Sequence, residues 1–148
     1  MIKYIGSKRL LIPTIVAAVR ELDGVRSVVD LFSGTSRVGH ALKGAGFRVL
    51  SNDHNAYAST IARCYVQADA EDVHDDAERL VREFNCLPGT SGYFTDSFCI
   101  KSRFFQPRNG ERVDAIREAI VVKALPPELE AVMLVSLMEA ADRVASPT

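Results

Sequence analysis

Residues 27–53 hold two short apolar runs separated by a glycine-containing turn, and no other feature of the chain constrains its fold as strongly. The runs 27–32 and 47–50 are rich in β-branched and apolar residues, which is typical of strands buried on both faces. Between them, a turn over 33–36 leads into apolar residues at helical spacing over 38–45. A strand, a turn, a helix and a second strand predict a βαβ unit with parallel strands, and therefore an α/β fold.

The rest of the chain indicates mostly helices. Residues 87–109 contain glycines, prolines and five aromatic residues, so we expect a long irregular segment there, with a short strand over 93–100. The last helix is apolar around much of its circumference and should be buried from more than one side. Because the sheet then has only two or three strands, we expect the chain to self-associate or to be marginally folded, with the edge of the second strand and the last helix at the contact. The expected helices cover residues 10–22, 56–67, 70–84, 114–124 and 128–144.

Composition narrows the class of protein. The 148 residues correspond to one domain, and 47% hydrophobic and 25% charged residues are typical of a globular protein. The net charge is −1, so binding of nucleic acid requires a local basic patch. No run of about 18 apolar residues and no secretory signal is seen. The three cysteines are widely spaced and share no metal-ligand spacing with the histidines, which predicts reduced thiols in a cytoplasmic protein without a metal site.

The glycine turn and two acidic residues indicate a binding site. Gly34 and Gly39 follow a strand and open a helix, where backbone N–H groups can approach a ligand closely. Asp53 follows the next strand, where a carboxylate can accept hydrogen bonds from a ribose diol. The residues directly after Gly39 include no lysine, which disfavours a phosphate-binding loop of the GxxxxGK[ST] type, and the turn lacks the second glycine of a GxGxxG dinucleotide-binding turn. Asp30 at the end of the first strand instead favours a cationic ligand such as S-adenosylmethionine.

Three segments together resemble the alpha-class DNA adenine-N6 methyltransferases. Residues 3–8 (KYIGSK) resemble the N-terminal cofactor motif of that family, and residues 30–39 (DLFSGTSRVG) resemble its glycine-rich motif. Residues 52–53 (ND) resemble the acidic end of its second strand. The three occur in the family's order and spacing. The resemblance implies a Rossmann-like fold, S-adenosylmethionine as cofactor, DNA as substrate, and a place in DNA methylation and restriction-modification.

The resemblance also implies roles for individual residues. Asp30 would meet the amino group of the cofactor, and Gly34 would allow close backbone approach. Phe32 would pack near the sulfur or, alternatively, lie in the core. Asp53 would hold the ribose hydroxyls. Tyr4, Gly6 and Lys8 would line the methionine carboxylate and the adenosine, although Tyr4 and Lys8 are also compatible with a solvated surface.

One departure from the family concerns catalysis. The family's catalytic tetrapeptide has the form D/N-P-P-Y/F, which holds and stacks on a flipped adenine. The chain has a single Pro-Pro pair, Pro126-Pro127, flanked by Leu125 and Glu128, which is a helix-start pattern. No catalytic residue is therefore assigned, and the chain resembles a truncated, N-terminal half of a methyltransferase.

A basic cluster in the second half is a candidate contact for DNA. Four cationic residues alternate with phenylalanines, which suits phosphate contact combined with base stacking, although a solvated loop with buried rings would look the same. The resemblance places residues 1–86 in the cofactor-binding part and residues 87–148 in the start of an inserted target-recognition region. The four residues are Lys101, Arg103, Arg108 and Arg112.

Three functions remain open at this stage. The first is an S-adenosylmethionine-dependent methyltransferase that acts on adenine N6 in DNA. The second is a truncated or split-subunit module without catalysis, which binds the cofactor, DNA, a second copy or a partner chain that completes the sheet. The third is an α/β nucleotide-binding protein with an unrelated glycine turn. A D/N-P-P-Y/F motif elsewhere in the gene or on a partner chain would separate the first two, and titration of the cofactor would test the third.

Overall fold

The computed structural model describes residues 8–145 and divides the chain into two compact units at Asp69 and Ala70. This boundary lies earlier in the chain than the one expected after residue 86. The assignment of a cofactor-binding part and a target-recognition part remains a prediction. Each unit is described by itself.

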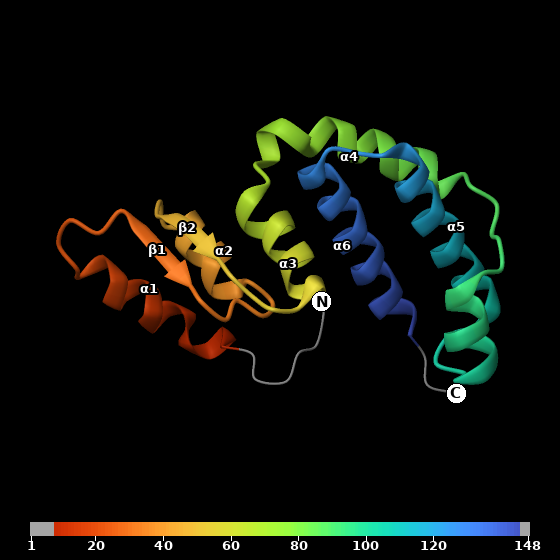
Figure 1. Cartoon of the computed structure of the whole chain (residues 1–148), viewed down its shortest axis with the longest axis horizontal. Coiled ribbons are helices and arrows are strands. Elements are labelled where there is room, and N and C mark those ends of the chain that lie inside the picture. Colours follow the sequence, from red (N-terminus) through yellow and green to blue (C-terminus); the bar gives the residue numbers. More distant parts are fainter. Residues whose placement is uncertain (1–7, 146–148) are drawn as a thin grey trace. The chain divides into compact units, whose positions relative to one another are not determined.

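The first unit is built around a parallel pair of strands, as the sequence predicted. β1 (Ser27–Asp30) pairs in parallel with β2 (Arg48–Ser51), with Ser27 opposite Arg48 and Asp30 opposite Ser51. The helix between them, α2 (Arg37–Gly44), packs on both strands (Figure 1). The described residues of this unit contain two strands, which is compatible with a truncated α/β fold. The remaining elements are η1 (Arg9–Leu11), α1 (Ile12–Arg20), α3 (Ala56–Ala62) and the π-helical turn η2 (Arg63–Gln67).

The strands are covered on one face, so the expectation that both faces are buried is wrong. On the covered face, Gly39 of α2 lies close to Val49 and Ser51, and Leu42 of α2 is buried. On the other face, Val29 and Leu50 lie opposite each other in the register and are 53% and 64% exposed. This open face, which we call the bare sheet face, carries these two apolar side chains and is left uncovered by the described residues of its own unit, 8–69.

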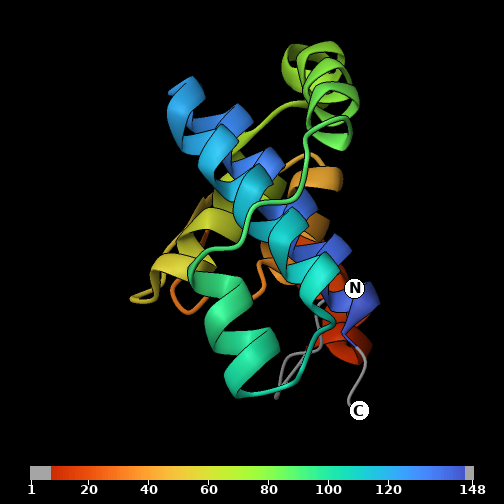
Figure 2. The same cartoon turned by 90° about the vertical axis from the view of Figure 1, so that its right-hand side faces the viewer.

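The second unit is helical. α4 (Ala70–Asn85), α5 (Pro107–Lys123) and α6 (Pro127–Val144) enclose a core, and α5 and α6 run antiparallel side by side (Figures 1 and 2). Because α6 contacts both α4 and α5, the prediction that it is buried from more than one side is confirmed. α4 and α5 thus cover two sides of α6, while the expectation that the chain self-associates through this helix stays a prediction. The buried core residues are Leu80, Phe84, Ile120, Leu129 and Met133.

The segment expected to be irregular contains a helix, so the expectation of a strand over 93–100 is wrong. Residues 93–94 are α-helical and continue into a π-helical segment, η3 (Thr95–Lys101). Helical spacing brings the rings of Phe94 and Phe98 together, with centroids 4.8 Å apart, and the ring of Phe105, beyond the end of η3, lies 5.0 Å from that of Phe94. α5 also begins at residue 107, because Pro107 occupies its first turn, where a missing N–H costs nothing.

Candidate functional site

The turn after β1 has an unusual backbone that brings the two strand ends together. Gly34 has a φ of +50° and Ser36 a φ of +53°, and a left-handed conformation is rare for a serine. The Ser33 N–H donates to the carbonyl of Asn52 at 3.0 Å, so the turn is tied to the residue that follows β2. The Asn52 side chain donates to the carbonyl of Leu31 at 3.0 Å. Such strained backbone persists only where surrounding contacts hold it.

Asp53 holds this turn in place. One carboxylate oxygen accepts the N–H of Gly34 at 2.8 Å, and the other accepts the N–H of Asn55 at 3.0 Å. These backbone hydrogen bonds, from Asn55 first and Gly34 second, lower the pKa of Asp53 below its ordinary value of 3.8. Each oxygen keeps a second lone pair that can accept a hydroxyl. The Gly34 N–H, by contrast, is already used within the turn.

Four polar atoms near the strand ends are buried and have no hydrogen-bond partner in the described part of the chain. One of them is a carboxylate oxygen, Oδ2 of Asp30, and burial of a carboxylate oxygen without a hydrogen bond has a high free-energy cost. Ser33 is 7% exposed and Ser36 is fully buried, and neither hydroxyl is partnered. Buried polar groups are normally hydrogen-bonded, so this set indicates a ligand that supplies the partners. The four atoms are Oδ2 of Asp30 and Oγ of Ser33, Ser36 and Ser51.

A cavity of about 380 Å³ adjoins the same turn. Ser33 and Asp53 line it from the turn side, and β2 forms a second wall. The third wall is one face of α3 and η2. This wall comprises Ser59, Ala62, Arg63, Val66 and Gln67.

The structure brings some of the expected site residues together. Asp30, Gly34 and Asp53 meet at the carboxyl ends of the strands. Phe32 follows β1 and is 80% exposed, so the alternative that it belongs to the core is wrong. Lys8 is exposed and precedes η1. Tyr4 and Gly6 lie outside the described residues.

Gly39 does not contribute a ligand contact of the kind expected. It is buried in α2, where an added Cβ would lie 3.0 Å from Oγ of Ser51 and 3.1 Å from a methyl of Val66. The absence of a side chain at Gly39 therefore lets α2 lie close to β2 and η2. Sequence alone does not separate this packing role from a role in binding.

The basic cluster in the second unit divides into two groups. Arg103 and Arg108 are exposed, and Lys101 is exposed and paired with Asp96 at 2.5 Å. Arg112 is half-buried, and its guanidinium donates to the carbonyls of Leu87, Phe84 and Asn85 at the end of α4. Arg112 thus ties α5 to the end of α4.

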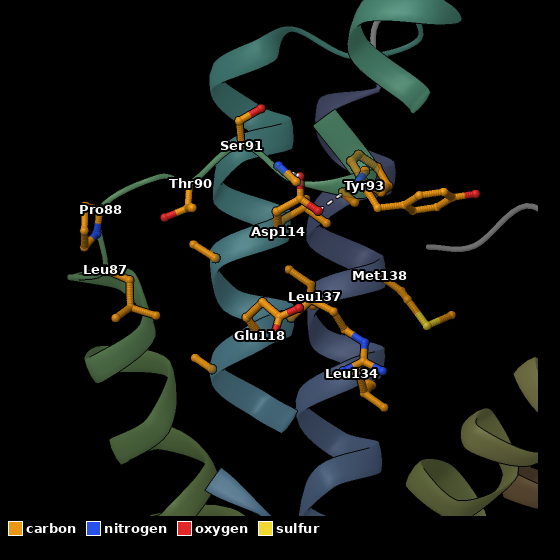
Figure 3. A pocket seen from close by; sticks show the side chains of 17 residues that line it. Leu87, Pro88, Thr90, Ser91, Tyr93, Asp114, Glu118, Leu134, Leu137 and Met138 are labelled. Atoms are coloured by element: carbon orange, nitrogen blue, oxygen red, sulfur yellow. Dashed lines mark hydrogen bonds between the residues drawn. The ribbon is translucent and has the colours of Figure 1, made fainter. Parts of the chain in front are cut away.

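A second carboxylate with a role in the fold was missed by sequence reasoning. Asp114 of α5 accepts the N–H groups of Gly92, Phe94 and Thr95 and the hydroxyl of Thr95, at 2.7–2.9 Å (Figure 3). Burial alone would raise the pKa of Asp114, but the hydrogen bonds from Thr95, Phe94 and Gly92 outweigh it and lower the pKa. No local sequence signal links positions about twenty residues apart, because the contact depends on the packing of η3 on α5.

Asp114 also lines a cavity of about 750 Å³ in the second unit, which is larger than the cavity beside the glycine turn. Figure 3 shows Leu134, Leu137 and Met138 reaching it from α6, and Glu118 from α5. Its lining is mostly apolar, with few polar groups that could orient a ligand.

Two kinds of site are not found in the described residues. No group of three or more His, Cys, Asp or Glu side chains among residues 8–145 could hold a metal ion. In the same range, no helix has both the length and the apolar character needed to cross a membrane.

The fold and the site define an α/β protein with a candidate small-molecule site at the carboxyl ends of two parallel strands. The model of the D12 class N6 adenine-specific DNA methyltransferase family matches residues 4–147, and the chain belongs to this family. No curated protein and no solved structure matches the chain. The expected methyltransferase family is thereby confirmed, and with it the class of enzyme.

Methyl transfer in such a family depends in general on S-adenosylmethionine, and the residues present fit this molecule. The unpartnered carboxylate oxygen of Asp30 matches a cationic amino group. The free lone pairs of Asp53 match ribose hydroxyls. The adjoining cavity of about 380 Å³ offers room for part of a nucleoside.

Proposed function

We propose that residues 8–69 form the S-adenosylmethionine-binding part, with a Rossmann-like arrangement, of an enzyme that methylates adenine N6 in DNA. The observation that carries this proposal is the buried, unpartnered oxygen of Asp30 beside a strained glycine turn. A buried carboxylate oxygen without a partner favours a hydrogen-bond donor or a cation at this place over a phosphate. The bound cofactor supplies an electrophilic methyl group on a sulfonium centre.

Within this proposal, the chain's own side chains bind the cofactor and orient it. Asp30 accepts a hydrogen bond from the amino group of the ligand. Asp53 accepts ribose hydroxyls while it continues to hold the N–H groups of Gly34 and Asn55, so one carboxylate both shapes the turn and contacts the ligand. Phe32, exposed at the end of β1, offers an apolar surface beside the turn. Tyr4, Gly6 and Lys8 remain assigned to the methionine carboxylate and the adenosine of the ligand.

Calorimetric titration of the 148-residue chain tests the proposal. We expect S-adenosylmethionine and S-adenosylhomocysteine to bind more tightly than NAD or ATP, because the turn lacks a lysine for phosphates and carries Asp30. Asp53→Ala should weaken binding by more than about tenfold, the scale of lost hydrogen bonds to a charged group. Tighter binding of ATP or NAD by the wild-type chain would contradict the proposal.

We further propose that Lys101, Arg103 and Arg108 contact DNA phosphates. All three are exposed, and Phe104 between them is 56% exposed and available for stacking. We leave Arg112 out of this set, because its guanidinium already bonds to the end of α4. Arg103→Gln with Arg108→Gln should reduce the salt dependence of duplex binding by about one unit of slope per lost contact. Arg20→Gln, an exposed arginine of α1, is the control, and an unchanged slope in the double variant would refute the contact.

A second candidate, a non-catalytic or split-subunit module, is favoured by two observations. The 148 residues contain no D/N-P-P-Y/F motif, and the bare sheet face is open to a covering chain. Under this proposal the chain alone transfers no labelled methyl group to duplex DNA, and a chain that carries the motif restores transfer. Transfer by the purified chain alone would rule out the split arrangement.

A further inference from the structure

Asn52, the residue before Asp53, makes three hydrogen bonds to the end of β1 and the residues that follow it. Its N–H donates to the carbonyl of Asp30 at 2.8 Å, and its carbonyl accepts the N–H of Ser33 at 3.0 Å. Its side-chain amide donates to the carbonyl of Leu31 at 3.0 Å. The first two bonds use backbone groups, which every residue except proline offers. Only the third bond depends on the asparagine side chain.

The segment that this amide contacts has little side-chain packing of its own. β1 ends at Asp30, so Leu31 and Phe32 lie beyond the paired part of the strand. The side chains of Leu31 and Phe32 are 60% and 80% exposed, so neither is anchored in a core. The Leu31 carbonyl belongs to the planar peptide group that joins these two residues. A hydrogen bond to this carbonyl therefore restricts the direction in which the Phe32 ring leaves the strand.

Asn52 and Asp53 hold different parts of the turn. Asp53 accepts the N–H groups of Gly34 and Asn55, and so ties the glycine turn to the start of α3. Asn52 holds the residues just before the turn. This second task needs a donor, which an amide has and an ionised carboxylate lacks. The asparagine at position 52 therefore has a role that a second aspartate could not fill.

We propose that Asn52 is a positioning residue of the cofactor site, which holds the Leu31–Phe32 peptide so that the Phe32 ring lies against the bound ligand. This inference rests on the proposed function, in which Phe32 offers an apolar surface beside the turn. Without the amide, the exposed ring samples more directions, and ordering it on binding costs affinity. Asn52 does not touch the ligand itself, so its effect on binding passes through Phe32.

A double-mutant cycle tests whether Asn52 acts through Phe32. The full 148-residue chain is titrated with S-adenosylhomocysteine as wild type, Asn52→Leu, Phe32→Ala and the double variant. Leucine keeps the size and branching of asparagine and removes the donor. We expect each single variant to lose affinity by about tenfold, the scale of one lost interaction. The double variant should bind no more weakly than Phe32→Ala alone.

Two further variants are controls for the cycle. Asn52→Gln keeps an amide at an exposed position and should recover part of the affinity that Asn52→Leu loses. Asn85→Leu, at the exposed end of α4, makes the same change away from the turn and should bind like the wild type.

A measurement on the wild-type chain covers variants that fail to fold. With ¹⁵N-labelled asparagine and ¹³C-carbonyl-labelled leucine, a scalar coupling across the hydrogen bond should join the side-chain nitrogen of Asn52 to the carbonyl carbon of Leu31 when the ligand is bound. Absence of this coupling, additive losses in the double variant, or wild-type affinity in either single variant would overturn the positioning role and leave the proposed function standing. Absence of S-adenosylhomocysteine binding to the wild-type chain would overturn both.

Discussion

At the scale of residues, two carboxylates organise the two units in the same way. Asp53 accepts hydrogen bonds from N–H groups of the glycine turn and of the residue before α3. Asp114 accepts them from N–H groups at the start of η3. In each case one side chain accepts hydrogen bonds from several backbone N–H groups in a turn or at the start of a helix, where no helical carbonyl precedes them. Backbone donors without such partners would be costly where they are buried.

Asp114 should make stability depend on pH. Because its folded-state pKa lies below the ordinary value of 3.8, the stabilisation is complete above that value and is lost as the pH falls through the folded-state pKa. Asp114→Asn should lower the free energy of unfolding at pH 7 by about 1–3 kcal/mol, the scale of hydrogen bonds to a charged group. Below pH 3.8, the free energy of unfolding of this variant should fall less steeply with decreasing pH than that of the wild type. Urea unfolding between pH 2 and pH 7 measures both effects. Asp75→Asn on the exposed side of α4 is the control. If the free energy of unfolding of Asp114→Asn fell with pH just as that of the wild type does, the role of Asp114 in the pH dependence would be contradicted.

At the scale of elements, close helix contacts depend on glycines that have ordinary helical conformations. Gly39 allows α2 to lie against β2, and Gly110 allows α5 to lie against η3. An added Cβ at Gly110 would overlap Sγ of Cys99 and would lie 3.1 Å from the Cα of Thr95. The thiol of Cys99 is buried, and burial raises its pKa, so this thiol acts as a packing group.

Gly110→Ala should therefore destabilise the helical unit by about 1–3 kcal/mol, as overpacking of a filled core does. Gly44→Ala is the control, since nothing lies within 4 Å of its added Cβ and alanine favours a helix. Thermal unfolding followed by circular dichroism measures the change. Cys99→Ala should recover part of the loss in the double variant, because it removes the overlapping sulfur. Equal melting temperatures for Gly110→Ala and the wild type would show that the space between Gly110 and η3 accommodates a methyl group.

At the scale of the whole molecule, the two units differ in how fully they bury their apolar surface. The helical unit covers α6 from two sides, and its core is continuous. The first unit leaves the bare sheet face open, although parallel sheets are normally covered on both faces. Exposed apolar patches of this kind mark surfaces that bind another chain or promote self-association.

Leu50→Thr should reduce self-association of the chain and its binding of a hydrophobic dye. Threonine keeps the preference for a strand and removes apolar surface from a side chain that is 64% exposed. Light scattering and dye fluorescence give the two readouts. Val122→Thr, on a residue of α5 that is 80% exposed, is the control and should change neither. A wild-type chain that is monomeric and binds no dye would show that the bare sheet face does not mediate self-association.

The sequence by itself determined the local order of the first unit and the family. Apolar runs of strand length, a glycine turn and helical spacing predict β1, α2 and β2, because short-range sterics and side-chain periodicity decide these elements. The juxtaposition of Asp30, Gly34 and Asp53 also followed, since the carboxyl ends of parallel strands meet at one edge.

Tertiary structure alone decided the rest. Aromatic residues over 93–105 favour a strand locally, but ring packing and the carboxylate of Asp114 stabilise a helix there. Gly39 matches a binding motif in the sequence, yet it serves the approach of α2 to β2. Arg112 looks like a surface cation in the sequence, yet it bonds to the end of α4. In each case a deciding partner, namely Asp114, strand β2 or the end of α4, lies ten or more residues away in the sequence, and only the folded chain brings it into contact.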